Sequence, residues 1–161
     1  MTISETKQAQ RAAGKAARKA LSPARRAKAS ACICAQIASL PEFRAAGRIL
    51  LYAAFGAEVD LAALAEEAAR QGKQIAYPVC GERFTMTAAV PAQSDGWEVG
   101  AYGIRTPILS RAEVLPPKAL DLVLVPCTAF DAACRRVGMG KGYYDRYLPR
   151  CKKAAKIGIA F

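Results

Sequence analysis

Short apolar runs rich in β-branched residues constrain this chain most. Residues 120–125 (LDLVLV) form the strongest of them, and residues 48–52 (RILLY) and 156–161 (KIGIAF) have the same character. Apolar runs of this length predict strands buried in a sheet. The fold must therefore bury at least three strands.

A helical segment separates two of the predicted strands. Residues 61–71 follow a plausible N-cap at Asp60, and Gly72 stands where a helix commonly ends in the left-handed conformation. A short strand at 74–77, closed by Pro78, comes next. With the preceding run this gives a strand–helix–strand unit, which predicts a parallel sheet.

The remaining segments fit the same class of fold. Ser22 and Pro23 suit a helix start, and they divide two helices predicted at 4–21 and 23–40. Other expected elements are a strand at 84–90, a surface-wrapping segment at 91–117 and a short helix at 143–151. We therefore predict one α/β domain over residues 1–161, with a mostly parallel sheet between two layers of helices.

Composition excludes several classes of protein. Of the 161 residues, 53% are hydrophobic and 23% charged, too apolar for a disordered chain. No apolar run approaches the roughly 20 residues of a membrane span, and the basic N-terminus lacks the apolar core of a secretory signal. The six cysteines form no CxxC pair and histidine is absent, which argues against zinc sites and His-dependent nucleophiles. We expect a cytoplasmic protein with reduced thiols and no membrane partner.

The net charge of +11 favours anionic partners. Eight basic residues lie in the first 28: Lys7, Arg11, Lys15, Arg18, Lys19, Arg25, Arg26 and Lys28. Charge alone leaves nucleic acid, nucleotide phosphates and polycarboxylates open.

The most informative segment runs from Arg136 to Asp145, after the strongest predicted strand. Ligands of open α/β sheets bind beyond the carboxyl ends of strands. The three spaced glycines of this segment let backbone N–H groups approach phosphate oxygens, and the helix that follows offers a positive N-terminal end. Lys141 adds positive charge, and Asp145 suits Mg²⁺, which needs few carboxylates when phosphate is present.

The glycine spacing by itself leaves a phosphate-binding loop and a structural turn equally open. The segment is not a Walker A loop, because Gly142 rather than Ser or Thr follows Lys141. Its spacing and late position also differ from the dinucleotide-binding fingerprint.

The run RVGMGKGYYDRYL at 136–148 closely resembles the C-terminal signature of the 5-formyltetrahydrofolate cyclo-ligase family. The upstream Pro-x-x-x-Phe-Asp of that signature is found at 126–131, and Lys7 and Arg11 match its N-terminal Lys-x-x-x-Arg. The resemblance covers about residues 7–161.

The resemblance implies an ATP- and Mg²⁺-dependent enzyme that cyclises 5-formyltetrahydrofolate to 5,10-methenyltetrahydrofolate, with release of ADP and phosphate. The formyl oxygen attacks the γ-phosphate, N10 closes the ring and phosphate departs. Positioning and charge neutralisation dominate such chemistry, so it suits a chain without histidine. The substrate is expected in mono- or polyglutamylated form.

The resemblance also implies roles for matching residues. Lys141 and Arg136 act in catalysis, Asp145 binds Mg²⁺, and Glu58 accepts hydrogen bonds from the pterin, with Tyr143 beside it. Lys7 and Arg11, one helical turn apart, reach the ATP phosphates. The nucleotide contacts are implied at Lys7, Arg11, Arg136, Gly138, Met139, Gly140, Lys141, Gly142, Tyr143 and Tyr144.

For the fold, the resemblance implies a three-layer α/β/α arrangement like the NagB/RpiA/CoA-transferase-like fold. Family members continue past the strand at 156–161 and add further strands and an acidic residue near the metal. Relative to them the C-terminus here is shortened, and we expect Asp145 to lack a second acidic metal ligand.

Two other functions stay open from the sequence. One is a nucleotide- or folate-binding relative without turnover. The other is a nucleic-acid-binding module that uses the basic N-terminal helices. The absence of an aromatic RNA-binding pattern disfavours the second.

Overall fold

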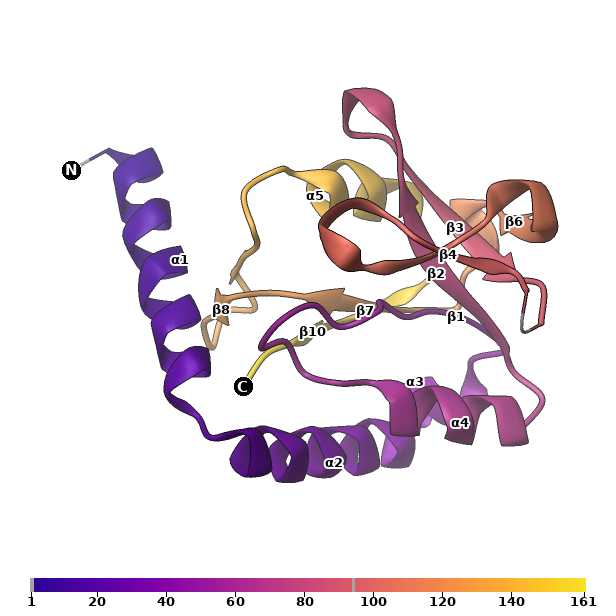
Figure 1. The fold of residues 1–161 in the computed structure, drawn as a ribbon, viewed down its shortest axis with the longest axis horizontal. Helices are drawn as coiled ribbons and strands as arrows, with labels where there is room; N and C mark the ends of the chain where they lie inside the picture. Colours follow the sequence, from indigo (N-terminus) through magenta and orange to yellow (C-terminus); the bar gives the residue numbers. More distant parts are fainter. Residues whose placement is uncertain (1, 94) are drawn as a thin grey trace.

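The computed structural model describes residues 2–93 and 95–161 and has an α/β fold built on one mixed sheet (Figure 1). The strands of the sheet are β1 (Arg48–Leu50), β2 (Gln74–Cys80), β3 (Met86–Pro91), β6 (Ala112–Leu115), β7 (Leu122–Pro126) and β10 (Ala155–Ile159). Their order is β10-β7-β1-β2-β3-β6. The first four in this order are parallel, and β3 and β6 are antiparallel to their neighbours. The predicted mostly parallel sheet is confirmed.

The helices agree closely with the predicted segments. They are α1 (Ile3–Ala20), α2 (Pro23–Ser39), α3 (Pro41–Ala45), α4 (Ala62–Arg70) and α5 (Tyr143–Tyr147), which the 3₁₀ turn η5 (Leu148–Arg150) continues. The Ser22 side chain caps α2 by accepting from Arg25 N, and Gly72 has the expected positive φ of 71°. Asp60 accepts from Ala62 N at 2.9 Å, although Leu61 occupies the N-cap position itself.

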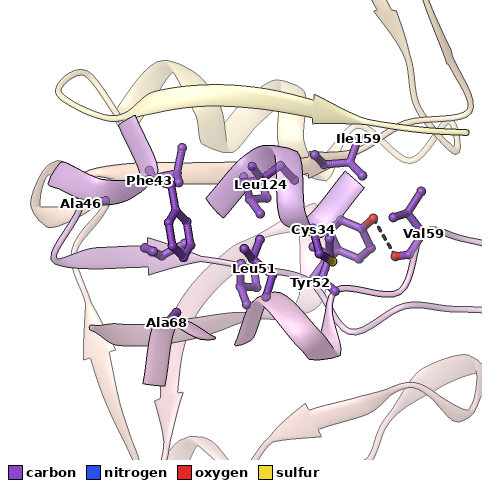
Figure 2. Packing of buried hydrophobic residues seen from close by; sticks show 14 residues of the cluster. Cys34, Phe43, Ala46, Leu51, Tyr52, Val59, Ala68, Leu124 and Ile159 are labelled. Atoms are coloured by element: carbon purple, nitrogen blue, oxygen red, sulfur yellow. Dashed lines mark hydrogen bonds between the residues drawn. The ribbon is translucent and has the colours of Figure 1, made fainter. Parts of the chain in front are cut away.

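Alternation along the central strands explains why their sequences are apolar throughout. Ile49 and Leu51 pack in one core cluster with residues of α2, α3 and α4, whereas Leu50 packs in a second cluster with residues of α5. In β7, Leu122 and Leu124 likewise face the first cluster. Successive side chains of a strand point to opposite faces, so a strand covered on both faces is apolar at every position. Figure 2 shows the first cluster around Leu51 and Leu124.

Two expectations about the fold were wrong in detail. Pro78 does not end β2, because the β1 partner stops at Ala76 and the missing N–H of Pro78 interrupts no pairing on that side. The strand expected from Phe84 begins at Met86, because Phe84 has a φ of 59°, outside the β region.

The segment 91–117 is more ordered than its prolines and glycines predict. Besides β6 it contains a hairpin of β4 (Trp97–Val99) and β5 (Arg105–Pro107). Trp97 packs edge-on against Tyr77 at 4.8 Å between ring centroids. Three 3₁₀ turns lie beside these strands: η2 (Ala101–Gly103), η3 (Leu109–Arg111) and η4 (Pro117–Ala119). Another, η1 (Glu82–Phe84), precedes β3.

Helix α1 stands beside the rest of the fold and meets a small hairpin of β8 (Ala129–Phe130) and β9 (Arg136–Val137) (Figure 1). The backbone approach is close at Gly14, where an added Cβ would lie 2.3 Å from Thr128 O. Only glycine fits this contact. In the described part of the chain, no helix has the length and apolarity to span a membrane.

Candidate functional site

The site lies where loops follow the carboxyl ends of β1 and β7. These parallel neighbours end on the same side of the sheet, so the segments after Leu50 and after Pro126 converge. Helix α1 flanks both segments. We call residues 136–145 the glycine loop.

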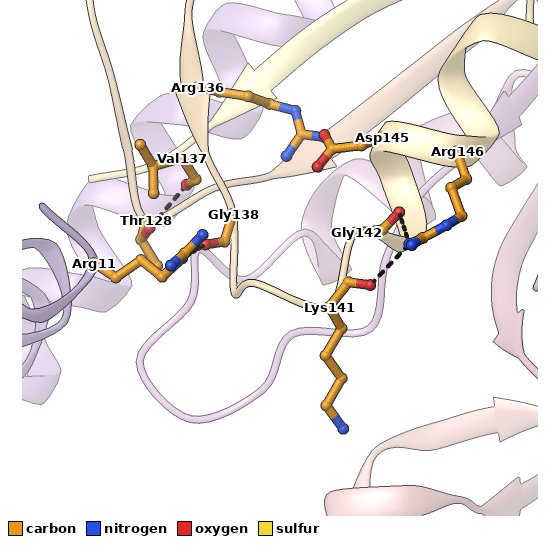
Figure 3. A network of polar contacts seen from close by, with 9 residues as sticks. All are labelled: Arg11, Thr128, Arg136, Val137, Gly138, Lys141, Gly142, Asp145 and Arg146. Carbon is orange, nitrogen blue, oxygen red and sulfur yellow. Dashed lines mark hydrogen bonds and ion pairs between the residues drawn. The ribbon is translucent and has the colours of Figure 1, made fainter. Parts of the chain in front are cut away.

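Each glycine of the glycine loop lies against an arginine side chain. Figure 3 shows Gly138 beside Arg11 and Gly142 beside Arg146. A Cβ at Gly138 would stand 3.0 Å from Arg136, one at Gly140 3.4 Å from Arg11, and one at Gly142 2.6 Å from Arg146. Gly140 and Gly142 also have positive φ, of 102° and 71°. The glycines therefore let guanidinium groups pack on the loop backbone. This arrangement suits polyphosphate, which arginine binds with paired N–H donors.

Two arginines hold the glycine loop through backbone carbonyls. Arg11 Nε donates to Gly138 O at 2.8 Å, so the structure brings the N-terminal helix to the glycine loop as predicted. Arg146 donates to the carbonyls of Lys141 and Gly142, both at 3.1 Å. Arg146 was not among the predicted site residues, although its place four residues after Gly142 puts it one helical turn away.

Arg136 and Asp145 form an ion pair at 2.6 Å. The Arg136 side chain is only 18% exposed and its guanidinium carbon lies 5.9 Å from the Tyr144 ring centre. Asp145 is 76% exposed. The predicted metal ligand is thus accessible beside a predicted catalytic arginine.

Lys141 points away from this pair (Figure 3). Its Nζ contacts the Tyr102 hydroxyl and lies 4.6 Å from the Tyr102 ring centre. That contact raises the pKa of Lys141, so the ammonium stays charged. Lys7 is exposed, and among the described residues its side chain forms no hydrogen bond or ion pair with the protein. The structure therefore does not bring Lys7 or Lys141 to Asp145.

A second part of the site is a cavity of about 220 Å³ between α1, the segment after β1 and Met139 of the glycine loop. We call it the Glu58 cavity. Its lining residues are Lys15, Arg18, Lys19, Phe55, Gly56, Ala57, Glu58 and Met139.

The Glu58 carboxylate is oriented by the backbone. Its Oε2 accepts from Phe55 N at 3.0 Å, and Glu58 N donates to Phe55 O at 3.2 Å. Burial raises the pKa of Glu58, while the Phe55 N–H and the charge of Arg18 act in the opposite direction. Glu58 is therefore a partly buried acceptor, suited to a ligand that presents N–H groups.

The two predicted tyrosines face different surroundings. The Tyr144 hydroxyl is buried and has no hydrogen-bond partner among the described residues; burial, and after it Cys80 and Glu58, raise its pKa. Tyr143 packs edge-on against Phe84 at 5.9 Å and lines a separate cavity of about 130 Å³. Tyr143 is thus not brought to Glu58 as predicted, because consecutive helical residues point in different directions.

The side chains at the site fit a magnesium–nucleotide complex better than a metal held by protein alone. In the segments that the structure describes, no three His, Cys, Asp or Glu residues cluster around a possible ion. Asp145 offers one exposed carboxylate beside the arginine-lined glycine loop. Mg²⁺ commonly binds proteins through one or two carboxylates plus substrate phosphates and water. Asp145 would supply that single ligand.

The fold and the site define an α/β protein with an arginine-lined glycine loop beyond its parallel strands. The profile of the 5-formyltetrahydrofolate cyclo-ligase family matches residues 3–161, and the chain belongs to that family. The resemblance found in the sequence is confirmed.

Individual relatives and a solved structure agree with this family assignment. The 5-formyltetrahydrofolate cyclo-ligase of Haemophilus influenzae is 33% identical over 76% of this chain and 68% of its own length. A relative from Schizosaccharomyces pombe is 30% identical over 75% of this chain, a match that spans 61% of that relative. The NMR structure of Aquifex aeolicus 5,10-methenyltetrahydrofolate synthetase superposes with a TM-score of 0.83 at 34% identity, over 96% of this chain and 77% of that one.

Proposed function

We propose that this chain catalyses the ATP- and Mg²⁺-dependent conversion of 5-formyltetrahydrofolate to 5,10-methenyltetrahydrofolate. The observation that carries the proposal is the glycine loop. Each of its three glycines lies against an arginine, and its Met139 lines the Glu58 cavity. Family membership supplies the reaction class. One part of the site suits phosphate and the other suits a hydrogen-bond-donating ring.

Within this proposal the glycine loop binds ATP. Arg11, Arg136 and Lys7 would neutralise the phosphates, and Asp145 would hold Mg²⁺, whose positive charge would add to that neutralisation. Lys141 supports the transferred phosphoryl group after its side chain leaves Tyr102 and turns inward. An exposed lysine loses little in that movement, since its present contact lies at the surface.

Glu58 and Met139 place the folate beside the phosphates. The Glu58 carboxylate accepts from the N–H edge of the pterin, and Met139 connects the cavity to the glycine loop. Holding the formyl oxygen and the phosphoryl group together accounts for much of the rate, because a bimolecular encounter becomes a positioned reaction.

The remaining finer features are also proposals. We infer a three-layer arrangement of the NagB/RpiA/CoA-transferase-like kind within one domain, supported by the two core clusters on opposite faces of the sheet. A cytoplasmic location is supported by cysteines that are all free in the described chain.

The test is formation of the methenyl product, followed by its absorbance, with ATP, Mg²⁺ and 5-formyltetrahydrofolate. We expect product that depends on all three components. Folded protein that binds both ligands without product would identify a non-catalytic relative. Folded protein that binds neither would exclude the proposal.

A further inference from the structure

Arg18 is an unusual residue of the Glu58 cavity because most of its side chain is buried while its guanidinium has no protein partner among the described residues. It is 8% exposed, the only residue of α1, residues 3–20, that is buried. Among the described residues, its guanidinium forms no hydrogen bond or ion pair with the protein. The guanidinium nitrogens keep contact with solvent, since the enclosed side-chain polar atoms without a partner in the described chain are the Tyr144 and Tyr147 hydroxyls. Its donors are therefore available to a ligand in the cavity that it lines.

Arg18 and Glu58 approach the same space from different elements. Arg18 comes from α1 and Glu58 from the segment after β1. Their side chains are not in salt-bridge contact, yet the charge of Arg18 lowers the pKa of Glu58. The Glu58 carboxylate, an acceptor held by a backbone N–H, and the Arg18 guanidinium, which carries several donors, thus line the same cavity without contacting each other.

The rest of the Glu58 cavity suits a flat ring. Phe55 and Met139 line it and are 41% and 49% exposed, so apolar surface is available for stacking. About 220 Å³ is below the roughly 300–1,000 Å³ of sites for whole drug-sized ligands. The cavity therefore fits one ring system, with the remainder of the ligand outside.

We propose that Arg18 and Glu58 together recognise the pyrimidinone edge of the reduced pterin. This inference rests on the proposed function. Glu58 accepts from the ring N3–H and the 2-amino group, and Arg18 donates to the neighbouring 4-oxo oxygen. The edge presents donor, donor and acceptor in a row, and the two side chains present the complementary sequence. Arg18 is thus a specificity-determining residue that favours a 4-oxo ring.

The test compares two ligands in two proteins by calorimetry without ATP. The ligands are 5-formyltetrahydrofolate and its 4-amino-4-deoxy analogue, which places a donor where Arg18 needs an acceptor and also lacks the ring N3–H that Glu58 accepts from. Wild-type protein should bind the 4-oxo ligand at least about tenfold more tightly, and Arg18→Met should reduce that preference about threefold or more, leaving the part that depends on Glu58 and the ring N3–H. Arg18→Lys should recover part of it. Arg25→Met, which removes an exposed arginine of α2, is the matched control and should behave as wild type.

The pH dependence of 5-formyltetrahydrofolate binding is a second measurement, and it should not change if Arg18 has only a structural role. The titratable and charged groups that face Glu58 from all sides are Lys15, Arg18, Lys19, Tyr52, Cys127 and Tyr144. Burial raises the pKa of Tyr52, Cys127 and Tyr144, so these three are neutral in the assay range. Arg18→Met should therefore move the acid limb of 5-formyltetrahydrofolate binding to higher pH.

The outcomes separate the alternatives. Equal losses for both ligands in Arg18→Met, or a change confined to ATP binding, would overturn the inference in favour of a structural or phosphate-binding role. If wild-type protein shows the Arg18-dependent preference but makes no product, the inference stands and the proposed activity falls. Absence of folate binding in the wild type overturns both.

Discussion

The glycine loop and the Glu58 cavity are neighbours, but they differ in how far protein groups satisfy their charged side chains. In the glycine loop, Arg136 is paired with Asp145 and Arg146 with backbone carbonyls. In the Glu58 cavity, Arg18 has no protein partner among the described residues and Glu58 has only a backbone N–H. A ligand at the glycine loop must exchange existing contacts. A ligand in the cavity completes contacts that the protein leaves unfinished, which favours selectivity because a mismatched ring leaves buried polar groups unpaired.

The largest effect should come from the glycine loop. Lys141→Ala should reduce kcat by about 10²–10³-fold, the size typical of losing one charge-stabilising group, with an unchanged melting temperature because Lys141 is exposed. Steady-state kinetics and thermal unfolding measure both. Tyr102→Phe, which removes only the hydroxyl that Lys141 contacts, should keep most activity. Normal turnover in Lys141→Ala, or its unfolding, would show that the assigned role is wrong.

The next largest effect should come from Glu58 and should change the KM for folate but not the KM for ATP. Glu58→Gln should raise KM for 5-formyltetrahydrofolate about 10- to 100-fold, as expected when a charged acceptor is lost. In the wild type, folate binding should weaken as pH falls, because protonation removes the acceptor, and the raised pKa moves that loss above the ordinary value near 4.5.

The contribution of Glu58 to protein stability should have the opposite pH dependence to its contribution to folate binding. A raised pKa means that the folded state favours the protonated form of Glu58, so its contribution to stability is full at low pH and is lost as pH rises through the folded pKa. At neutral pH the ionised group opposes folding, and Glu58→Gln should raise the melting temperature. A variant that loses both stability and folate binding would indicate a structural role for Glu58.

A third change, Gly14→Ala, should affect the glycine loop and the Glu58 cavity together. Gly14→Ala places a Cβ 2.3 Å from Thr128 O and must shift α1, which carries Arg11 and Arg18. Overpacking of this kind costs about 1–3 kcal/mol, so KM for ATP and for folate should both rise, about five- to tenfold. The helix itself should persist, since alanine favours helices. Ala13→Ser, at an exposed position of α1, is the control. An effect on one substrate alone would contradict a shared helix.

The smallest kinetic effect should come from Asp121, outside both regions. Asp121 accepts from Gly47 N and Arg48 N and pairs with Lys153 at 2.6 Å. Asp121→Ala should leave both KM values unchanged and lower the free energy of unfolding by about 1–3 kcal/mol, measured by urea titration.

The pH dependence of that difference checks its cause. The Lys153 contact and the two backbone N–H groups lower the pKa of Asp121 in the folded protein. Its contribution is therefore present above about pH 4, the ordinary range of an aspartate, and is lost as pH falls below it. A difference that persists in acid would exclude this ion pair as its source.

Local patterns made the glycine loop predictable, and the family resemblance pointed to Glu58, but neither revealed that Arg18 lies near Glu58. The glycine loop lies within ten consecutive residues, so its spacing and its family resemblance are visible in the sequence. Arg18 and Glu58 are forty residues apart, and their proximity depends on how α1 packs. The central strands were predictable because both faces are buried, whereas β4 and β5 are three-residue strands whose flanking glycines and prolines conceal them. The orientations of Tyr143 and Lys141 depend on tertiary contacts with Phe84 and Tyr102.

The thin attachment of α1 has a thermodynamic consequence. An 18-residue helix that buries only Arg18 is held by few contacts, yet Arg11 meets the glycine loop and Arg18 the Glu58 cavity. Whichever ligand binds first restricts the helix and so reduces the ordering entropy left for the second. Nucleotide and folate should therefore strengthen each other's binding by one common factor. Deuterium exchange of the α1 amides would report this coupling, with fast exchange in the protein alone, slower exchange with either ligand and the slowest with both.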